Sequence, residues 1–399
     1  MGHINKELIA SYGSHFIDKN DINNVVSVLK GKHLTQGQTI EKFEKSFSKL
    51  VHANNTIVCS NGTSAIHLAL IAVGIKKDDY VIVPSITFLA AANAVKYLGA
   101  MIIFSDVNPR NGLVEPENLL ETLDRCKRIG IYKKIKAFIP VHLNGNCTDL
   151  KEIQNICRKK KITIVEDSCH ALGTKYKPIK SKQKHPIGSC KFSDISTFSF
   201  HPVKIIATGE GGAVTINNKQ KANYLRKIRS HGIIKSENKL CFYKVKDLGF
   251  NYRLNDISCS LGLSQLKKIN FFIKKRRKIV NYYKKKLKNL ESFLDFIKVD
   301  KYCDPAWHIF VVLINFNKLK INKDKFLYYL KQKGIGIQVH YVPLIFQPLY
   351  KKEIKVSNYR GAKEYYSKAL TLPLSIRMTL KDVDFIVKNI RQVIEKYKI

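Results

Sequence analysis

One lysine, Lys204, stands between an apolar run at residues 195–200 and a glycine-rich turn, Thr-Gly-Glu-Gly-Gly, at residues 208–212. Earlier in the chain, a β-branched run at residues 162–165 leads into two carboxylates, the second of which is Asp167. Pyridoxal phosphate (PLP) needs a lysine that forms a Schiff base and an aspartate that keeps the pyridine nitrogen protonated, so that the ring can act as an electron sink. A buried strand that delivers Asp167 and a loop that delivers Lys204 therefore predict a PLP site.

Lys204 considered alone has a second interpretation, a solvated loop lysine, because lysine and arginine together number 70 in this chain. Its combination with Asp167 and the glycine run favours the catalytic role. A lysine near its reference pKa of about 10.4 would be protonated and could not act as a base. We therefore expect desolvation and the adjacent cofactor to lower the pKa of Lys204.

A second chemical signal follows a short strand predicted at residues 56–59. Residues 60–70 turn into a helix that begins with Gly62, Thr63 and Ser64. The free N–H groups at a helix start lie at the positive end of the helix dipole and can bind an anion such as a phosphate. An ordinary helix N-cap explains the same residues.

Strand and helix patterns alternate through the first two thirds of the chain. Strands are predicted at residues 80–84, 101–104, 137–141 and 162–165, and helices at 89–98, 117–128 and 150–160. This alternation favours an α/β fold with a mostly parallel central sheet flanked by helices. Ligands of such sheets bind at the carboxyl ends of the strands, where Phe88, Asp167 and Gly62 all fall.

The length of 399 residues accommodates two domains. From about residue 261 the pattern changes to lysine-rich helices with a few strands, so we expect a large domain at 1–260 and a smaller α+β domain at 261–399. No apolar run reaches the roughly 18 residues of a transmembrane helix, and the N-terminus lacks the apolar core of a signal peptide. A cytoplasmic protein is expected. The nine cysteines contain no Cys-x-x-Cys pair, so neither a disulfide framework nor a metal site is predicted.

The formal net charge of +39 raises the alternative of a basic nucleic-acid-binding or regulatory protein. Against it, the lysines are spread along the chain. The densest clusters, at residues 274–278 and 284–286, alternate with apolar residues, as in an amphipathic helix with a hydrated basic face. A basic surface would also steer a nucleotide diphosphate towards the protein. A regulatory protein built on an inactive PLP-enzyme fold would have lost Lys204 or Asp167, and both are present.

Three stretches, residues 165–173, 198–204 and 208–212, resemble the DegT/DnrJ/EryC1/StrS family of PLP-dependent aminotransferases that act on nucleotide-linked keto-sugars. The resemblance runs from about Tyr12 to the C-terminus. It implies the aminotransferase fold of type I and a homodimer with active sites shared across the interface.

The resemblance also implies roles for individual residues. In the cofactor site, Gly62, Thr63, Ser64 and Ser199 bind the phosphate, Phe88 stacks on the ring, and His170 donates a hydrogen bond to the ring oxygen. Many family members carry glutamine in place of His170. Asn251 is expected to reach the phosphate in the neighbouring subunit. The expected substrate contacts are Tyr12, Arg253, His340 and Tyr341.

The implied reaction is a ping-pong transamination with glutamate as the amino donor. Residues 166–173, 187–194 and 338–343 resemble most the members that aminate C4 of a UDP-linked 4-keto-6-deoxy-hexosamine in pseudaminic acid biosynthesis. GDP- or dTDP-linked 4-keto-sugars of the perosamine type are the alternatives. A sugar dehydratase of this fold would carry histidine in place of Lys204. An aminotransferase for small keto acids would use an arginine clamp, for which the sequence offers no assignable arginine.

Overall fold

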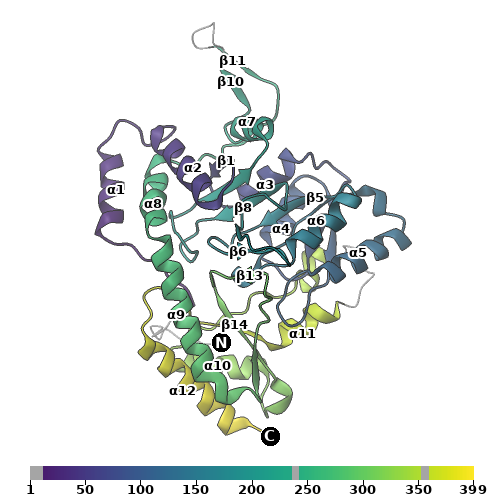
Figure 1. Ribbon diagram of the computed structural model, residues 1–399, viewed down its shortest axis with the longest axis vertical. Helices are drawn as coiled ribbons and strands as arrows, with labels where there is room; N and C mark the ends of the chain where they lie inside the picture. The colour runs from purple at the N-terminus through teal and green to yellow at the C-terminus, as the bar shows by residue number, and fades with distance from the viewer. Residues whose placement is uncertain (1–11, 236–241, 352–358) are drawn as a thin grey trace.

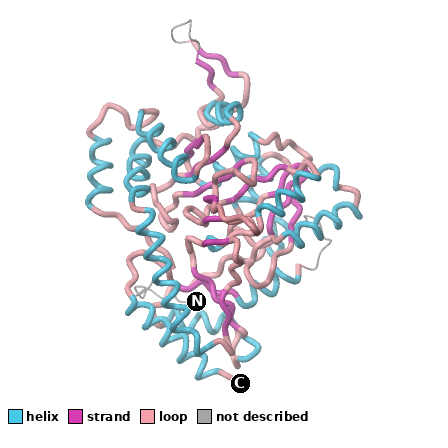
Figure 2. The backbone as a smooth tube through the Cα atoms, viewed as in Figure 1, coloured by secondary structure: helices cyan, strands magenta, loops and turns pink. Residues whose placement is uncertain are grey.

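A seven-stranded sheet forms the centre of the computed structural model, which describes residues 12–235, 242–351 and 359–399 (Figures 1 and 2). The strand order is β1-β9-β8-β5-β4-β2-β3. The strands are β1 (Asn55–Cys59), β2 (Tyr80–Pro84), β3 (Met101–Ser105), β4 (Ile135–Phe138), β5 (Thr163–Asp167), β8 (Ile195–Ser199) and β9 (Gly212–Ile216). Strands β3, β2, β4, β5 and β8 are parallel, whereas β9 runs antiparallel to both of its neighbours. The predicted mostly parallel sheet is confirmed.

Helices pack against this sheet and contribute to the large core, which continues into the C-terminal part. They are α3 (Gly62–Ala72), α4 (Ala90–Tyr97), α5 (Pro116–Arg128), α6 (Leu150–Lys159) and α7 (Lys219–Ile228). Helix α3 packs on α4, and α5 packs on α6. The strand predicted at 137–141 instead ends at Phe138. Pro140 has no N–H for a ladder hydrogen bond, and Val141 returns as an isolated bridge to Asp167.

The N-terminal segment of the described chain forms two helices joined by a turn. Helices α1 (Lys19–Leu29) and α2 (Gln38–Val51) both pack on α8 (Asp256–Lys267). Buried Asp256 accepts hydrogen bonds from the backbone N–H groups of Gly37 (2.9 Å) and Thr39 (3.1 Å). This contact joins the start of α2 to the start of α8.

The C-terminal part combines long helices with a small antiparallel sheet. The helices are α9 (Ile269–Leu287), α10 (Lys323–Gln332), α11 (Arg360–Lys368) and α12 (Leu380–Tyr397); the sheet is β12 (Leu294–Phe296), β14 (Phe310–Ile314) and β15 (Ala369–Leu372). Short strands β6 (Lys175–Tyr176), β7 (His185–Pro186) and β13 (Cys303–Asp304) form a third sheet, and β13 ties the C-terminal part to the large one. The boundary predicted after residue 260 falls within α8 and stays a prediction.

Helix α9 carries the basic run that was expected to be hydrated. Lys274, Lys278 and Lys285 are exposed, but Arg276 is fully buried, and the expectation is wrong there. Its Nη1 donates to the carbonyl oxygens of His308 (2.8 Å), Leu374 (3.3 Å) and Trp307 (3.4 Å). Arg276 belongs to the buried face of α9, whose other members are mostly apolar. No ion pair of its side chain occurs among the described residues.

Two further features concern the surface. A hairpin of β10 (Ile233–Lys235) and β11 (Tyr243–Val245) projects from the body at the top of Figure 1. Across the described ranges, no helix combines the length and the apolar character needed to span a membrane.

Candidate active site

A cavity of about 440 Å³ opens where β5 and β8 end and α3 begins. Strands β5 and β8 are parallel neighbours, so their carboxyl ends deliver side chains to the same edge of the sheet. The cavity brings together ten of the residues predicted for the site: Tyr12, Gly62, Thr63, Phe88, Asp167, His170, Ser199, Lys204, His340 and Tyr341.

The two residues that suggested PLP chemistry both line this cavity. Asp167 is the last residue of β5 and is 6% exposed; its Oδ1 accepts the backbone N–H of Cys169 at 3.1 Å. Lys204 follows a tight turn in which its backbone N–H donates to the carbonyl oxygen of His201 at 2.8 Å. Burial lowers the pKa of Lys204, and the nearby Cys169 and Asp167 oppose the shift. The direction agrees with the one expected from the sequence.

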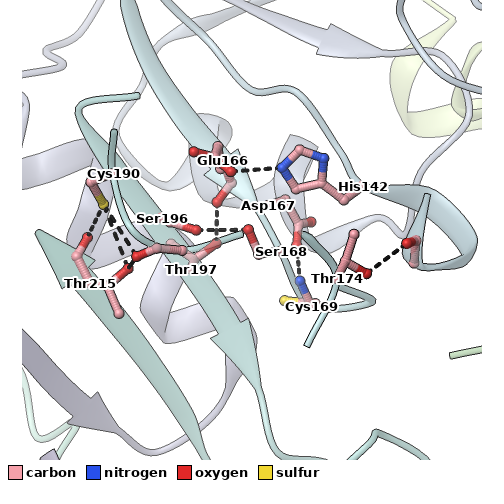
Figure 3. A network of polar contacts seen from close by, with 12 residues as sticks. His142, Glu166, Asp167, Ser168, Cys169, Thr174, Cys190, Ser196, Thr197 and Thr215 are labelled. Atoms are coloured by element: carbon pink, nitrogen blue, oxygen red, sulfur yellow. Dashed lines mark hydrogen bonds and ion pairs between the residues drawn. The ribbon is translucent and has the colours of Figure 1, made fainter. Parts of the chain in front are cut away.

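A buried hydrogen-bond network supports the end of β5 (Figure 3). Glu166 directly precedes Asp167 in the strand, so its side chain points to the opposite face of the sheet. There its Oε2 lies 2.7 Å from Nε2 of His142. The backbone N–H of His142 donates to the carbonyl oxygen of Asp167 at 3.1 Å, and Thr197 Oγ1 donates to that of Glu166 at 3.0 Å. The network therefore fixes the backbone that carries Asp167.

The start of α3 supplies the predicted anion site, with one change in the residues that face it. Asn61 is the N-cap, and its Oδ1 accepts the backbone N–H of Ser64 at 2.8 Å. The Ser64 hydroxyl in turn accepts the backbone N–H of Asn61 at 3.1 Å. Ser64 is thus engaged in a capping box and, unlike Gly62 and Thr63, is not part of the cavity lining in the described chain.

Ser199, the last residue of β8, lies directly beside the helix start. A Cβ atom placed on Gly62 would lie 2.8 Å from Cβ of Ser199 and 3.4 Å from Sγ of Cys169. Only glycine lets the first turn of α3 approach β8 this closely. The first-turn N–H groups and the Ser199 hydroxyl therefore border the same small volume, which suits a phosphate.

Aromatic side chains from distant segments close the other side of the cavity. Phe88 is 51% exposed, and its ring centroid lies 5.9 Å from that of Tyr341. Tyr12 lies 5.4 Å from the ring of His340, whose Nδ1 is 2.8 Å from Oγ1 of Thr371. The backbone N–H of Leu374 donates to the Tyr12 carbonyl at 3.3 Å, which holds the N-terminal segment around Tyr12 against the C-terminal part.

Besides Ser64, two more of the predicted residues, Asn251 and Arg253, do not line this cavity. Asn251 is exposed and pairs with Ser230 in an isolated β-bridge. Arg253 donates from Nη1 to the Ser230 hydroxyl at 3.1 Å. Both residues lie on the segment that follows the projecting hairpin, outside this cavity.

The cavity lining also includes residues that the sequence analysis did not assign to the site, among them Thr87, Cys169 and His308. His308 is 3% exposed, and its ring centroid lies 4.4 Å from that of His170. Within the described ranges, neither Nδ1 of His308 nor Oγ1 of Thr87 has a hydrogen-bond partner, although both atoms are buried. Thr87 and Cys169 adjoin Phe88 and Asp167 in sequence and could have been found there. No local sequence motif around His308 indicated a place in the site.

The three cavity histidines that are buried all resist protonation. Burial, with a contribution from Lys204, lowers the pKa of His170 and His308 well below the usual range and that of His340 to about 4. At neutral pH these three histidines are therefore uncharged.

The residues present fit PLP. An amine with a lowered pKa, a carboxylate at a strand end and a helix N-terminus next to a serine hydroxyl line one cavity. The buried Thr87 hydroxyl without a partner indicates that a further polar group belongs in this volume.

Comparison with known proteins gives consistent results. The model of the DegT/DnrJ/EryC1/StrS aminotransferase family matches residues 15–391. The chain is 34% identical over 388 residues (97% of this chain, 98% of the relative) to the UDP-4-amino-4,6-dideoxy-N-acetyl-beta-L-altrosamine transaminase of Campylobacter jejuni subsp. jejuni serotype O:23/36.

Among solved structures, it resembles Helicobacter pylori PseC, an aminotransferase involved in the biosynthesis of pseudoaminic acid, with a TM-score of 0.88, 29% identity and coverage of 98% and 100% of the two chains. It also resembles the PLP form of the putative sugar aminotransferase Spr1654 from Streptococcus pneumoniae (TM-score 0.87, 25% identity, coverage of 96% and 98%). The chain therefore belongs to the DegT/DnrJ/EryC1/StrS aminotransferase family and uses pyridoxal phosphate as its cofactor.

Proposed function

We propose that this aminotransferase moves an amino group from glutamate to the C4 keto group of a UDP-linked 4-keto-6-deoxy-hexosamine, as in pseudaminic acid biosynthesis. The observation that carries the proposal is a complete lysine–aspartate cavity in a chain that is 34% identical, over 97% of its length, to a transaminase of that type. The amino donor comes from the family resemblance alone.

Each part of the cavity has a task in this reaction. PLP, when bound, supplies an electron sink for the carbon that gains or loses the amino group. Lys204, with its lowered pKa, is available as a base that takes a proton from that carbon and as an acid that returns it. Asp167 holds the pyridine nitrogen protonated, while the amides of Gly62 and Thr63 with the Ser199 hydroxyl hold the phosphate. Phe88 covers the ring and excludes water.

The site is proposed to be complete only in a homodimer. Asn251 is exposed on its own subunit and lies outside its own cavity, which supports a contact between Asn251 of the partner subunit and the phosphate. Arg253, on the same segment, is a proposed contact to the nucleotide. The cytoplasm is the proposed compartment, because every cysteine among the described residues is free, as expected under reducing conditions.

Spectroscopy of the purified protein with PLP tests this proposal. The visible band of the cofactor should bleach when glutamate is added and return when a UDP-linked 4-keto-6-deoxy-hexosamine follows. Lys204→Ala should lose the response completely, whereas Lys274→Ala, which removes an exposed lysine of α9, should retain it. Recovery with a GDP-linked keto-sugar and none with the UDP-linked one would refute the substrate but keep the aminotransferase.

A further inference from the structure

A chain of polar contacts crosses the cavity wall from the backbone of Asn144 to the side chain of Tyr341. The backbone N–H of Asn144 donates to Nδ1 of His170 at 3.4 Å. On the other side of the imidazole ring, Nε2 lies 3.1 Å from the hydroxyl oxygen of Tyr341. These contacts join the loop after β4, the loop after β5 and the segment after α10.

The direction of the hydrogen bonds follows from the chemistry of the first donor. A backbone N–H can only donate, so Nδ1 of His170 must be an unprotonated acceptor. Because burial keeps His170 neutral, its single ring proton then lies on Nε2. That proton is donated to the hydroxyl oxygen of Tyr341. The hydroxyl proton of Tyr341 remains available for another acceptor, and none is present for it among the described residues.

The surroundings of His170 restrict any rearrangement of this chain. Asn144 adopts a left-handed backbone conformation with φ of 66°. A Cβ atom on Gly145 would lie 3.0 Å from the carbonyl oxygen of His170 and 3.2 Å from the backbone nitrogen of His308. The His308 ring packs 4.4 Å from that of His170. His170 is therefore held on the side of the cavity where Tyr341 lies.

Tyr341 is placed to use its free proton within the cofactor site. Its ring lies 5.9 Å from that of Phe88, and both residues line the cavity with Asp167 and Lys204. We propose that Tyr341 donates the hydrogen bond to the phenolic oxygen of the cofactor ring and that His170 and the Asn144 amide orient it. His170, expected from the sequence to be that donor, becomes a positioning residue. This inference rests on the PLP site described above and not on the identity of the sugar.

Tyr341 suits this task because it stays protonated. Burial raises the pKa of Tyr341 well above its usual value, and the charge of Asp167 adds to the shift. A hydroxyl that already accepts a hydrogen bond is also a stronger donor. The titratable groups around the chain of contacts are Asp167, Cys169, Tyr12 and Tyr365 beside Tyr341, and Lys204, His308 and His340 beside His170.

The experiment records the visible spectrum of the PLP-loaded protein against pH, with no amino donor and no sugar. Tyr341→Phe removes the donor, and His170→Leu removes both the acceptor and the donor that orient it. Each should shift the pH midpoint of the spectral transition by about one to two units, the usual effect of a hydrogen bond to a charged oxygen. His170→Gln should stay close to wild type, because an amide side chain can also accept from Asn144 and donate to Tyr341.

Tyr328→Phe, which changes a half-exposed tyrosine of α10, is the matched control and should leave the midpoint in place. An unshifted midpoint in Tyr341→Phe, with a shift in His170→Leu, would show that His170 itself is the donor and would overturn the proposal. Because sugar and donor are absent, a wrong sugar assignment cannot produce that result. Absence of a cofactor band in the wild-type protein would refute the proposed function as well.

A second measurement needs no variant that could fail to fold. The ¹⁵N chemical shifts of histidine-labelled protein without cofactor report which ring nitrogen of each histidine is protonated. His170 should be protonated on Nε2 at neutral pH. Protonation on Nδ1 would remove the Asn144 hydrogen bond and overturn the proposal.

Discussion

His340 shows at the residue scale how the cavity sets the charge of its own side chains. Its pKa falls from the usual 6.5 to about 4, because burial and the charge of Lys204 both disfavour a second cation. Lys204 and Asp167 could be predicted from the sequence, because each follows a strand pattern. The cavity histidine His308 could not, because it is delivered by the C-terminal part of the chain, far from either motif.

The lowered pKa of His340 predicts a pH-dependent contribution to stability. Between about pH 4 and 6.5 the unfolded chain binds a proton at this residue that the folded protein excludes, so stability falls as the pH falls through this window. The full difference corresponds to about 3 kcal/mol. Chemical unfolding at several pH values should show a flatter dependence in His340→Asn. Equal slopes in wild type and His340→Asn would refute this assignment.

At the scale of elements, the strands and helices of the large sheet follow the sequence pattern closely. The strand predicted at 80–84 coincides with β2, and the helix predicted at 117–128 lies within α5. The burial of Arg276 was missed because a run of charged residues usually marks a hydrated face. The period of Phe272, Ile279, Val280 and Tyr283 does place position 276 on the inward stripe of α9. The antiparallel direction of β9 has no counterpart in a local pattern, because it is set by pairing between distant segments.

The N-terminus of α3 allows stability and cofactor binding to be separated by two matched substitutions. Asn61 caps α3 and Asn255 caps α8, and each side chain accepts the third helical N–H at 2.8 Å. Replacement of either by alanine should cost about 1 kcal/mol of stability. Only Asn61→Ala should also weaken PLP binding, because only Asn61 lies in the cavity lining and orients the N–H groups proposed to hold the phosphate. A PLP titration followed by the visible band measures this. Equal PLP affinities in the two variants would contradict the phosphate assignment.

At the scale of the whole molecule, the proposed dimer predicts that two inactive variants restore each other. Lys204→Ala removes the reactive amine from its own site, and Asn251→Ala removes the proposed phosphate contact from the site of the partner subunit. In a mixed dimer one site has both residues intact. Unfolding the two variants together and refolding them should restore about a quarter of wild-type activity, because half of random dimers are mixed and each has one complete site. If no activity returns although mixed dimers form, Asn251 acts within its own subunit.

The order of strands in the sheet also affects how the chain can fold during synthesis. Among the described strands, β1 pairs with β9 alone, with Asn55 opposite Ile216 and Cys59 opposite Gly212. On the ribosome, β1 therefore waits for a partner until β9 has emerged, while β2, β3 and β4 can already pair with one another. Because β1 leads directly into α3, the proposed phosphate site at the start of α3 is among the last parts of the large domain to assemble. A chain cut before residue 212 would keep an unpaired apolar strand, which is prone to aggregation.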